Sequence, residues 1–227
     1  MIDFKKLVAE TLVENSNNYT KDDSLFEFHP SQICQCERQI FFSKIKASHF
    51  SVEILGKMQV GTCLHIFFER LQEIKDRCDI ETPFALQFPE FGFVIKGKSD
   101  CKEKDNSALY DFKGIASFSY ILRQPMEHNV EQVNVYLKAF NISKGVIVYV
   151  HKLDLSILPH EINFNQELFN HTIEKLKKVY PALKDWELTG DPRNPFPKCG
   201  CWNCGSENLK PEYLELVRQF ELKQDWK

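Results

Sequence analysis

The sequence lacks the features that would mark a membrane or secreted protein. No apolar run in its 227 residues approaches the ~20 residues that span a bilayer. The first residues also lack the apolar block and the small-residue cleavage site of a secretory signal. We therefore expect an intracellular protein that has no membrane association.

The chain also lacks a strong excess of charge of one sign. Its net charge is −3, which argues against a nonspecific DNA coat protein, because such proteins are strongly basic. Any contact with DNA would have to come from local charge, as in the groove of an enzyme. Hydrophobic residues make up 43% and charged residues 27% of the chain, which is typical of a globular protein and not of a disordered one.

The order of helical and strand patterns predicts a mixed α/β fold. A short amphipathic helix begins the chain, and helical spacing of apolar residues recurs at 30–46, 52–77, 127–140, 165–186 and 210–223. Strand patterns occupy 81–88, 91–103, 108–115, 145–152 and 156–164. We expect one domain, 1–227, with a central mixed sheet flanked by helices. It would comprise a helical segment (1–50), a core (51–190) and an irregular, cysteine-bearing end with a last helix (191–227).

Two neighbouring strand patterns carry acidic residues that a hairpin would bring together. Alternation puts Asp100 on one face with the even-numbered residues of 94–102, and puts Asp111 on one face with Lys113. The turn sequence at 104–107 suits antiparallel pairing, so that Asp100 and Asp111 converge. Two carboxylates suit Mg²⁺, which activates water and offsets charge on phosphorus, and an ammonium group steadies developing negative charge. The alternative is a solvated strand face of mixed charge.

Two helical segments add polar residues that suit the same site. His65 lies beside the apolar stripe of 52–77 and would add a nitrogen ligand to the two carboxylates. His128, Gln132 and Tyr136 recur at intervals of four residues, on one face of a helix, where they would line a groove beside the hairpin. The alternatives are a core histidine and a polar stripe that faces solvent.

The eight cysteines are unusual for a chain of this length. An intracellular setting disfavours disulfides. We expect Cys63, Cys78 and Cys101 to pack in the core, since a free thiol behaves as a small buried hydrophobe. The remaining cysteines gather near the two ends of the chain, at positions 34, 36, 199, 201 and 204.

Four motifs in this order resemble the RecB-like branch of the PD-(D/E)XK nucleases. They are His65, Gly97-Lys-Ser-Asp100, Asp111-Phe-Lys113 and Gln132-Val-Asn-Val-Tyr136, and the resemblance covers about residues 31–204. It implies Mg²⁺- or Mn²⁺-dependent cleavage of DNA, commonly exonucleolytic on single strands. The metal ligands that it implies are His65, Asp100, Asp111 and Phe112. The catalytic residues that it implies are Asp100, Asp111, Lys113, Gln132 and Tyr136.

The cysteines are arranged in a way that is similar to the iron–sulfur nuclease of CRISPR adaptation and to the AddB exonuclease. In those proteins one cysteine before the core and three after it bind a [4Fe–4S] cluster. Here the resemblance implies Cys36, in the segment Cys36-Glu-Arg38, together with Cys199, Cys201 and Cys204. The late spacing C-x-C-x-x-C is narrower than is usual in the family, so a structural Zn²⁺ site is the alternative. Cys34 is an alternative to Cys36.

The resemblance also implies partners: DNA that is single-stranded or has an end, and a helicase or proteins of recombination or CRISPR adaptation. Lys96, Lys98, Lys102 and Lys104 near the hairpin would help to attract the phosphate backbone. Phe118 and Tyr120 could stack on bases, and the alternative is that they are core residues without such a role.

Two other functions are compatible with parts of the pattern. A non-catalytic DNA-binding or assembly subunit could keep the fold and the metal cluster, but the set of acidic and lysine residues is complete, which argues against it. An unrelated zinc-binding regulatory module would not need the long α/β core upstream of the last cysteines.

Overall fold

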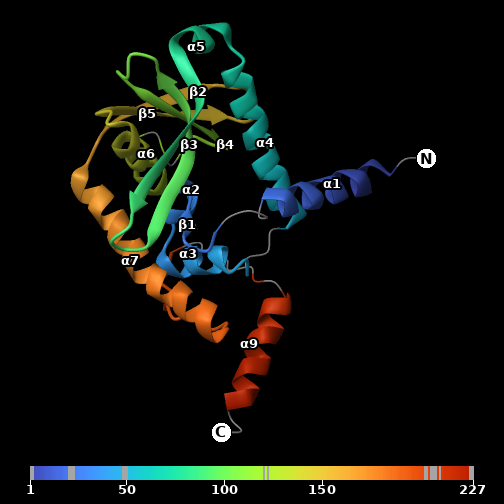
Figure 1. Ribbon diagram of the computed structural model, residues 1–227. Helices are drawn as coiled ribbons and strands as arrows, with labels where there is room; N and C mark the ends of the chain where they lie inside the picture. Colours follow the sequence, from blue (N-terminus) through green and yellow to red (C-terminus); the bar gives the residue numbers. More distant parts are fainter. Residues whose placement is uncertain are drawn as a thin grey trace.

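The computed structural model describes residues 3–19, 24–47, 51–119, 121, 123–201, 204, 209 and 211–224, so Tyr120 lies outside the described residues. At its centre is the expected mixed sheet, six-stranded and flanked by helices (Figure 1). The strand order is β1-β3-β4-β5-β6, with β2 also paired to β3. The strands are β1 (Glu27–Phe28), β2 (Cys78–Phe88), β3 (Phe93–Glu103), β4 (Leu109–Ile115), β5 (Lys144–His151) and β6 (Ile157–Asn163).

The topology brings the two acidic strands together as expected. β3 and β4 pair antiparallel on either side of the turn at 104–107. β4 and β5 are parallel and are joined through helix α6 (Glu127–Phe140), because parallel strands need a long crossover. β5 and β6 form a second antiparallel hairpin. The short strand β1, which runs parallel to β3, was not predicted.

Helices cover both faces of the sheet (Figure 1). Leu64 and Phe68 of α4 (Val52–Glu69) pack on one face, where the ring of Phe68 stacks on that of Phe112 at a centroid distance of 4.7 Å. Val133 and Leu137 of α6 pack on the opposite face. These two faces are called the α4 face and the α6 face below. The remaining helices are α1 (Phe4–Tyr19), α2 (Pro30–Ile33), α3 (Glu37–Lys44), α5 (Gln72–Arg77), α7 (Gln166–Thr189) and α9 (Pro211–Gln224).

Two segments that were predicted to form single helices each form two helices. The segment 30–46 forms α2 and α3, separated by the turn that carries Cys34 and Cys36. The segment 52–77 forms α4 and α5, because Leu71 adopts an extended conformation with φ −64° and ψ 129°. Its side chain is 40% exposed, so the buried stripe of α4 ends at Phe68 and the chain turns toward β2.

The expectation that three cysteines pack in the core holds for two of them. Cys78 and Cys101 are buried, whereas Cys63 is exposed on α4. Among the described residues, none of the helices combines the length and the apolarity that a membrane crossing needs.

Candidate active site and cysteine cluster

Asp100 lies where the pairing of β2 with β3 is interrupted. The register runs regularly up to Thr82 and resumes at Ile80, but Glu81 and Asp100 between them are not paired. Glu81 has φ 49°, a left-handed conformation that is unfavourable for a residue with a side chain.

The interruption reverses the alternation of side chains along β3. A Cβ on Gly97 would lie 3.2 Å from the ring of Phe84, which packs on the α6 face. Cys101 packs with Leu64 on the α4 face, although strict alternation would give positions 97 and 101 the same face. The predicted unbroken alternation through 94–102 is therefore wrong, and Asp100 lies at the point of reversal.

The two oxygens of Asp100 have different neighbours. Oδ2 accepts a hydrogen bond of 2.8 Å from the backbone N–H of Phe112 on β4. Oδ1 lies 3.4 Å from Nδ1 of His65 on α4. Burial lowers the pKa of His65, but the hydrogen bond and the charge of Asp100 outweigh this, so that the pKa is raised. The structure thus brings His65 and Asp100 together, and the contact with Phe112 joins them to the Asp111-Phe-Lys113 segment.

Asp111 and Lys113 form a buried pair on β4. Asp111 is fully buried, and Nζ of Lys113 lies 3.1 Å from its Oδ1 and 3.0 Å from its Oδ2. Burial raises the pKa of Asp111 to about 6; the charge of Asp100 acts in the same direction and that of Lys113 opposes it. Burial lowers the pKa of Lys113, but the Asp111 and Asp100 carboxylates outweigh this and raise it. Lys113 is therefore a cation beside two carboxyl groups.

This set of donors suits a divalent cation. Oδ2 of Asp111 is buried, and although Nζ of Lys113 lies 3.0 Å away, it accepts no hydrogen bond from any residue that the structure describes. A buried carboxylate is costly unless cations and hydrogen bonds offset its charge, and one ammonium faces the two carboxyl groups of Asp111 and Asp100. Carboxylate oxygens and an imidazole nitrogen are available from Asp111, Asp100 and His65, whereas Phe112 can offer only its backbone carbonyl.

The polar stripe of α6 extends from the acidic centre to a cleft. Nε2 of Gln132 donates a hydrogen bond of 2.8 Å to the hydroxyl of Tyr136. Burial, followed by the charges of Asp111 and Asp100, raises the pKa of Tyr136 well above its usual value, so the phenol stays protonated. His128 and Gln132 line a cleft of about 1130 Å³.

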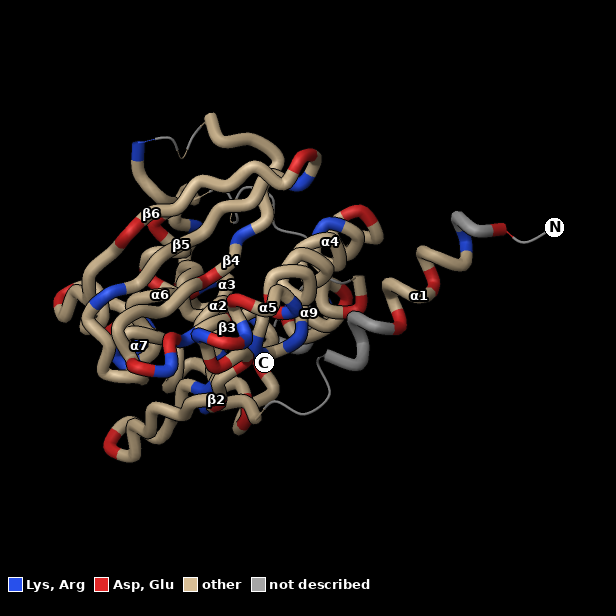
Figure 2. Tube along the Cα trace, turned by 90° about the horizontal axis from the view of Figure 1, so that it is seen from above, with Lys and Arg blue, Asp and Glu red and all other residues tan. Residues whose placement is uncertain are grey.

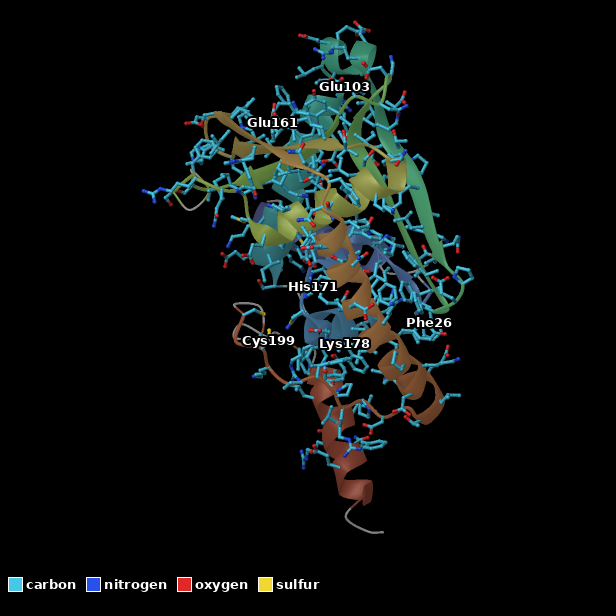
Figure 3. The ribbon with its side chains drawn as sticks, turned by 90° about the vertical axis from the view of Figure 1, so that its left-hand side faces the viewer. Phe26, Glu103, Glu161, His171, Lys178 and Cys199 are labelled. Carbon is cyan, nitrogen blue, oxygen red and sulfur yellow. The ribbon has the colours of Figure 1, made fainter. Side chains whose placement is uncertain are left out.

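The cleft runs from the α6 stripe toward the cysteine-bearing end of the chain. Its walls include Cys34, Gln35 and Cys36 on one side and residues of α6 and α7 on the other. Figure 3 shows His171 on α7, above the loop that carries Cys199. The cleft therefore connects the surroundings of Gln132 with the cysteines.

Each of the four basic residues predicted to attract the phosphate backbone has an ion-pair or hydrogen-bond partner in the structure. Lys96 pairs with Glu27 at 2.6 Å, Lys98 with Glu81 at 3.1 Å and Lys102 with Asp79 at 3.0 Å. Nζ of Lys104 donates to two backbone carbonyls at the end of α5. Figure 2 shows basic and acidic residues interspersed along the described chain. Phe118 lies against the ring of His151, at a centroid distance of 5.7 Å.

Four cysteines form a cluster at the far end of the cleft. Cys36 lies before α3, and Cys199, Cys201 and Cys204 come from the irregular segment after α7. Their sulfur atoms all lie within 4.8 Å of one another. Cys34 is not part of this cluster, because its thiol donates to the carbonyl of Pro30 at 2.9 Å. Of the two early candidates, the structure thus brings Cys36 to the late cysteines.

Neighbouring contacts hold the two cysteine-bearing segments together. Nη1 of Arg38 donates to the carbonyl of Phe196 at 2.7 Å, and Nδ2 of Asn194 donates to the carbonyl of Arg38 at 3.1 Å. The backbone N–H of Cys201, followed by hydrogen bonds with the Cys201 and Cys204 thiols, lowers the pKa of Cys199 to about 7. Burial raises the pKa of the Cys36 and Cys201 thiols, so Cys199 becomes the thiolate, which is the form that binds metals, more readily than those two.

Three of the six sulfur–sulfur separations are close to those expected around one tetrahedral ion, and all lie within 4.8 Å. The Cys36–Cys204, Cys199–Cys204 and Cys36–Cys201 sulfur pairs are 3.5, 3.6 and 3.8 Å apart. Four thiolates at about 2.3 Å from one zinc ion have sulfur–sulfur edges of about 3.8 Å. In a [4Fe–4S] cluster each thiolate binds a different iron, so the four sulfurs lie further apart.

Comparisons with known proteins bear on the fold. No protein-family model matches the chain, and no curated protein matches it. The crystal structure of SSO0001 matches with a TM-score of 0.60 and 20% identity, over 82% of this chain and 87% of that one. A putative exonuclease from Eubacterium rectale matches with a TM-score of 0.54 and 12% identity, over 84% and 91% of the two chains. An alkaline exonuclease from Laribacter hongkongensis matches with a TM-score of 0.51 and 13% identity, over 70% and 89%.

The chain has the PD-(D/E)XK-like fold. This agrees with the resemblance found in the motifs, whose order along the chain corresponds to α4, β3, β4 and α6.

Sequence reasoning missed two acidic residues around this site. Glu69 lies one helical turn after His65, and burial, followed by the charge of Glu81, raises its pKa. The spacing of four residues from His65 was a signal that could have identified it. Glu131 precedes Gln132 and is 8% exposed, although it is charged. No pattern in the sequence identifies its partner, Lys175, which lies 44 positions later.

Proposed function

We propose that this chain is a divalent-metal-dependent nuclease that hydrolyses phosphodiester bonds in DNA, as an exonuclease on single strands. The observation that carries the proposal is the fully buried carboxylate of Asp111, whose Oδ2 accepts no hydrogen bond from a described residue and has the Lys113 ammonium 3.0 Å away. It lies against the ammonium of Lys113 and within the electrostatic influence of Asp100. Within the described residues, this arrangement suits a cation and an attacking water better than it suits a stable protein core.

Each residue has a role that its contacts support. Asp100, Asp111 and His65 hold Mg²⁺ or Mn²⁺, with the carbonyl of Phe112 as a further ligand. A divalent ion at this centre would supply Lewis acidity and lower the pKa of bound water. Lys113 would orient the attacking water and stabilise negative charge as the new phosphorus–oxygen bond forms and the bond to the leaving oxygen breaks. Gln132 and Tyr136 donate hydrogen bonds to the phosphate or to the adjoining nucleotide.

The cleft supports a single strand as the substrate. One end adjoins Gln132, and its volume of about 1130 Å³ is ample for one or more nucleotides. The paired lysines on β3 provide no open basic surface for a duplex backbone. Alkaline and putative exonucleases share the fold, and that likeness supports a nuclease without identifying its substrate.

The test is cleavage of end-labelled DNA by the purified protein. Single-stranded, blunt duplex and closed circular substrates are incubated with Mn²⁺, Mg²⁺ or chelator, beside an RNA of the same sequence. We expect metal-dependent shortening of the linear single strand from an end, and loss of cleavage in Asp111→Asn. Equal cleavage by the wild type and by Asp111→Asn would refute the assignment of this centre.

We infer that the cysteine cluster is a separate, structural metal site. The sulfur separations support Zn²⁺, whereas a [4Fe–4S] cluster would require the four sulfurs to move apart. Metal analysis and a visible spectrum of protein purified without oxygen distinguish the two.

A non-catalytic DNA-binding subunit remains the second candidate for the whole chain, and it predicts DNA binding without cleavage in any metal. A helicase or proteins of recombination or CRISPR adaptation are the partners to test for.

A further inference from the structure

A buried ion pair joins α6 to α7 in the wall of the cleft. Nζ of Lys175 lies 2.9 and 3.0 Å from the two carboxylate oxygens of Glu131, and each residue is 8% exposed. The hydroxyl of Thr172 donates a second hydrogen bond to Glu131, at 3.2 Å. Neither charged residue belongs to the acidic centre or to the cysteine cluster.

The same ammonium also reaches a third element. Nζ of Lys175 donates to the backbone carbonyl of Gln35 at 3.3 Å. Gln35 lies in the turn between α2 and α3, directly before Cys36 of the cysteine cluster. Glu131 directly precedes Gln132, whose side chain contacts Tyr136. One ammonium group thus binds the turn that carries a cluster cysteine and the helix that carries the polar stripe of the active site.

Stability alone does not account for this pair. Removing two charges from water carries a large desolvation cost, and well-packed apolar residues of similar volume often stabilise a protein as well or better. What a buried pair does provide is a fixed geometry, because its directional hydrogen bonds are satisfied in one arrangement. Around Lys175 that arrangement sets the relative positions of α6, α7 and the Cys34–Cys36 turn.

We propose that Lys175 is a positioning residue that couples the cysteine cluster to the active site, through Gln35 on one side and Glu131 on the other. The proposal rests on the nuclease function proposed above. Metal binding at Cys36 fixes the turn, the turn fixes Lys175, and Lys175 fixes the stretch of α6 that presents Gln132 to the substrate. Displacements of about 1 Å at a catalytic group are enough to reduce turnover strongly.

The main test compares Lys175→Met with two control variants on α7. Lys177→Met makes the same chemical change where the lysine pairs within its own helix, with Glu174 at 2.6 Å. Val179→Ala removes buried volume from the core without touching the pair. For Lys175→Met we expect kcat to fall by about tenfold while KM for DNA changes by less than about twofold. Lys177→Met should leave both constants unchanged. Val179→Ala should lower the thermal midpoint and retain kcat.

A second readout does not depend on cleavage. The metal-free proteins are loaded with Zn²⁺ under reducing conditions, and its loss to a chelator is followed. Lys175→Met should lose zinc about tenfold faster than the wild type, because the turn before Cys36 is no longer held. Lys175→Arg, which keeps the charge and a donor, should restore both kcat and zinc retention.

The outcomes separate the two proposals. If the wild type cleaves no DNA but Lys175→Met still releases zinc faster, the coupling of Lys175 to the cluster stands and the nuclease function fails. If Lys175→Met keeps the kcat and the zinc retention of the wild type, the coupling is wrong. The coupling is also wrong if Val179→Ala has the same thermal midpoint as Lys175→Met and shows the same loss of kcat.

Discussion

The backbone N–H of Phe112 donates a hydrogen bond of 2.8 Å to Oδ2 of Asp100. This bond ties the carboxylate of β3 to the residue between Asp111 and Lys113 on β4, where only two residue pairs of the two strands are in register. The other oxygen of Asp100 is left facing His65, at 3.4 Å. One oxygen thus fixes the geometry of the site, and the other is available to a ligand.

Asp100→Asn separates these two functions of the carboxylate. The amide oxygen of asparagine can still accept from Phe112, so the strands should keep their positions, but one anionic ligand is lost. We expect the Mn²⁺ concentration for half-maximal cleavage to rise by about tenfold or more, because hard cations prefer charged oxygen ligands. A Mn²⁺ titration of cleavage measures this, with Asp105→Asn in the exposed turn as the control. An unchanged titration would count against Asp100 as a ligand.

Asp111→Ala and Lys113→Ala should each abolish cleavage while the fold is retained. Asp111→Ala removes the buried ligand, and Lys113→Ala removes the cation that stabilises charge at phosphorus. Each change should reduce the cleavage rate by about a hundredfold or more. Lys113→Ala should also lower the thermal midpoint, since it leaves a buried carboxyl without its partner. Cleavage of a labelled strand and circular dichroism provide the measurements, with Lys98→Ala as a surface control. Undiminished cleavage by both variants would end the assignment.

Periodicity predicted most of the fold because a strand buries every second residue and a helix buries every third or fourth residue. The α6 boundaries coincide with the predicted 127–140, and the strands at 108–115 and 145–152 match β4 and β5 to within one residue. The turns within 30–46 and 52–77 were missed because apolar residues continue through them. Leu71 fits the helical stripe in sequence, yet it is 40% exposed where the chain turns.

The site was less predictable than the fold. The prediction of alternating side chains assumes that the pairing of the strands is unbroken. The sequence gives no sign that Glu81 adopts a left-handed conformation, since glycine and asparagine are the residues that usually adopt it. The Glu131–Lys175 pair joins residues 44 positions apart, and no local spacing encodes such a contact. The ion pairs of the lysines near the hairpin were unpredictable for a related reason: their acidic partners lie elsewhere in the sequence, as with Glu27 and Lys96.

Gln132→Ala should reduce turnover more than its cost in stability explains. Gln132 is 9% exposed and donates to the hydroxyl of Tyr136, so the change removes a polar contact beside the cleft together with some packing. We expect kcat or DNA affinity to fall by about tenfold, and the free energy of unfolding to fall by about 1–3 kcal/mol. Steady-state kinetics and urea unfolding measure the two quantities. Tyr136→Phe, which removes the partner hydroxyl, is the matched variant, and an effect on stability alone would contradict a role in the active site.

Cys201→Ser should destabilise the protein, with activity falling as a consequence. Cys201 lies in an irregular segment and 165 positions after Cys36, to which its thiol donates at 3.8 Å, so a metal that bridges them closes a very long loop. Because metal binding to such a site is folding free energy, its loss should lower the thermal midpoint by about 5 °C or more. Cys63→Ser, at an exposed thiol of α4 outside the cluster, should change neither the midpoint nor the metal content. Thermal unfolding and metal analysis of both variants provide the comparison.

A Zn²⁺ site would give a colourless protein with about one zinc per chain. A [4Fe–4S] cluster would give a brown one that absorbs near ~400 nm. Wild-type protein that contains neither metal, or a Cys201→Ser variant as stable as Cys63→Ser, would remove the cysteine cluster as a metal site.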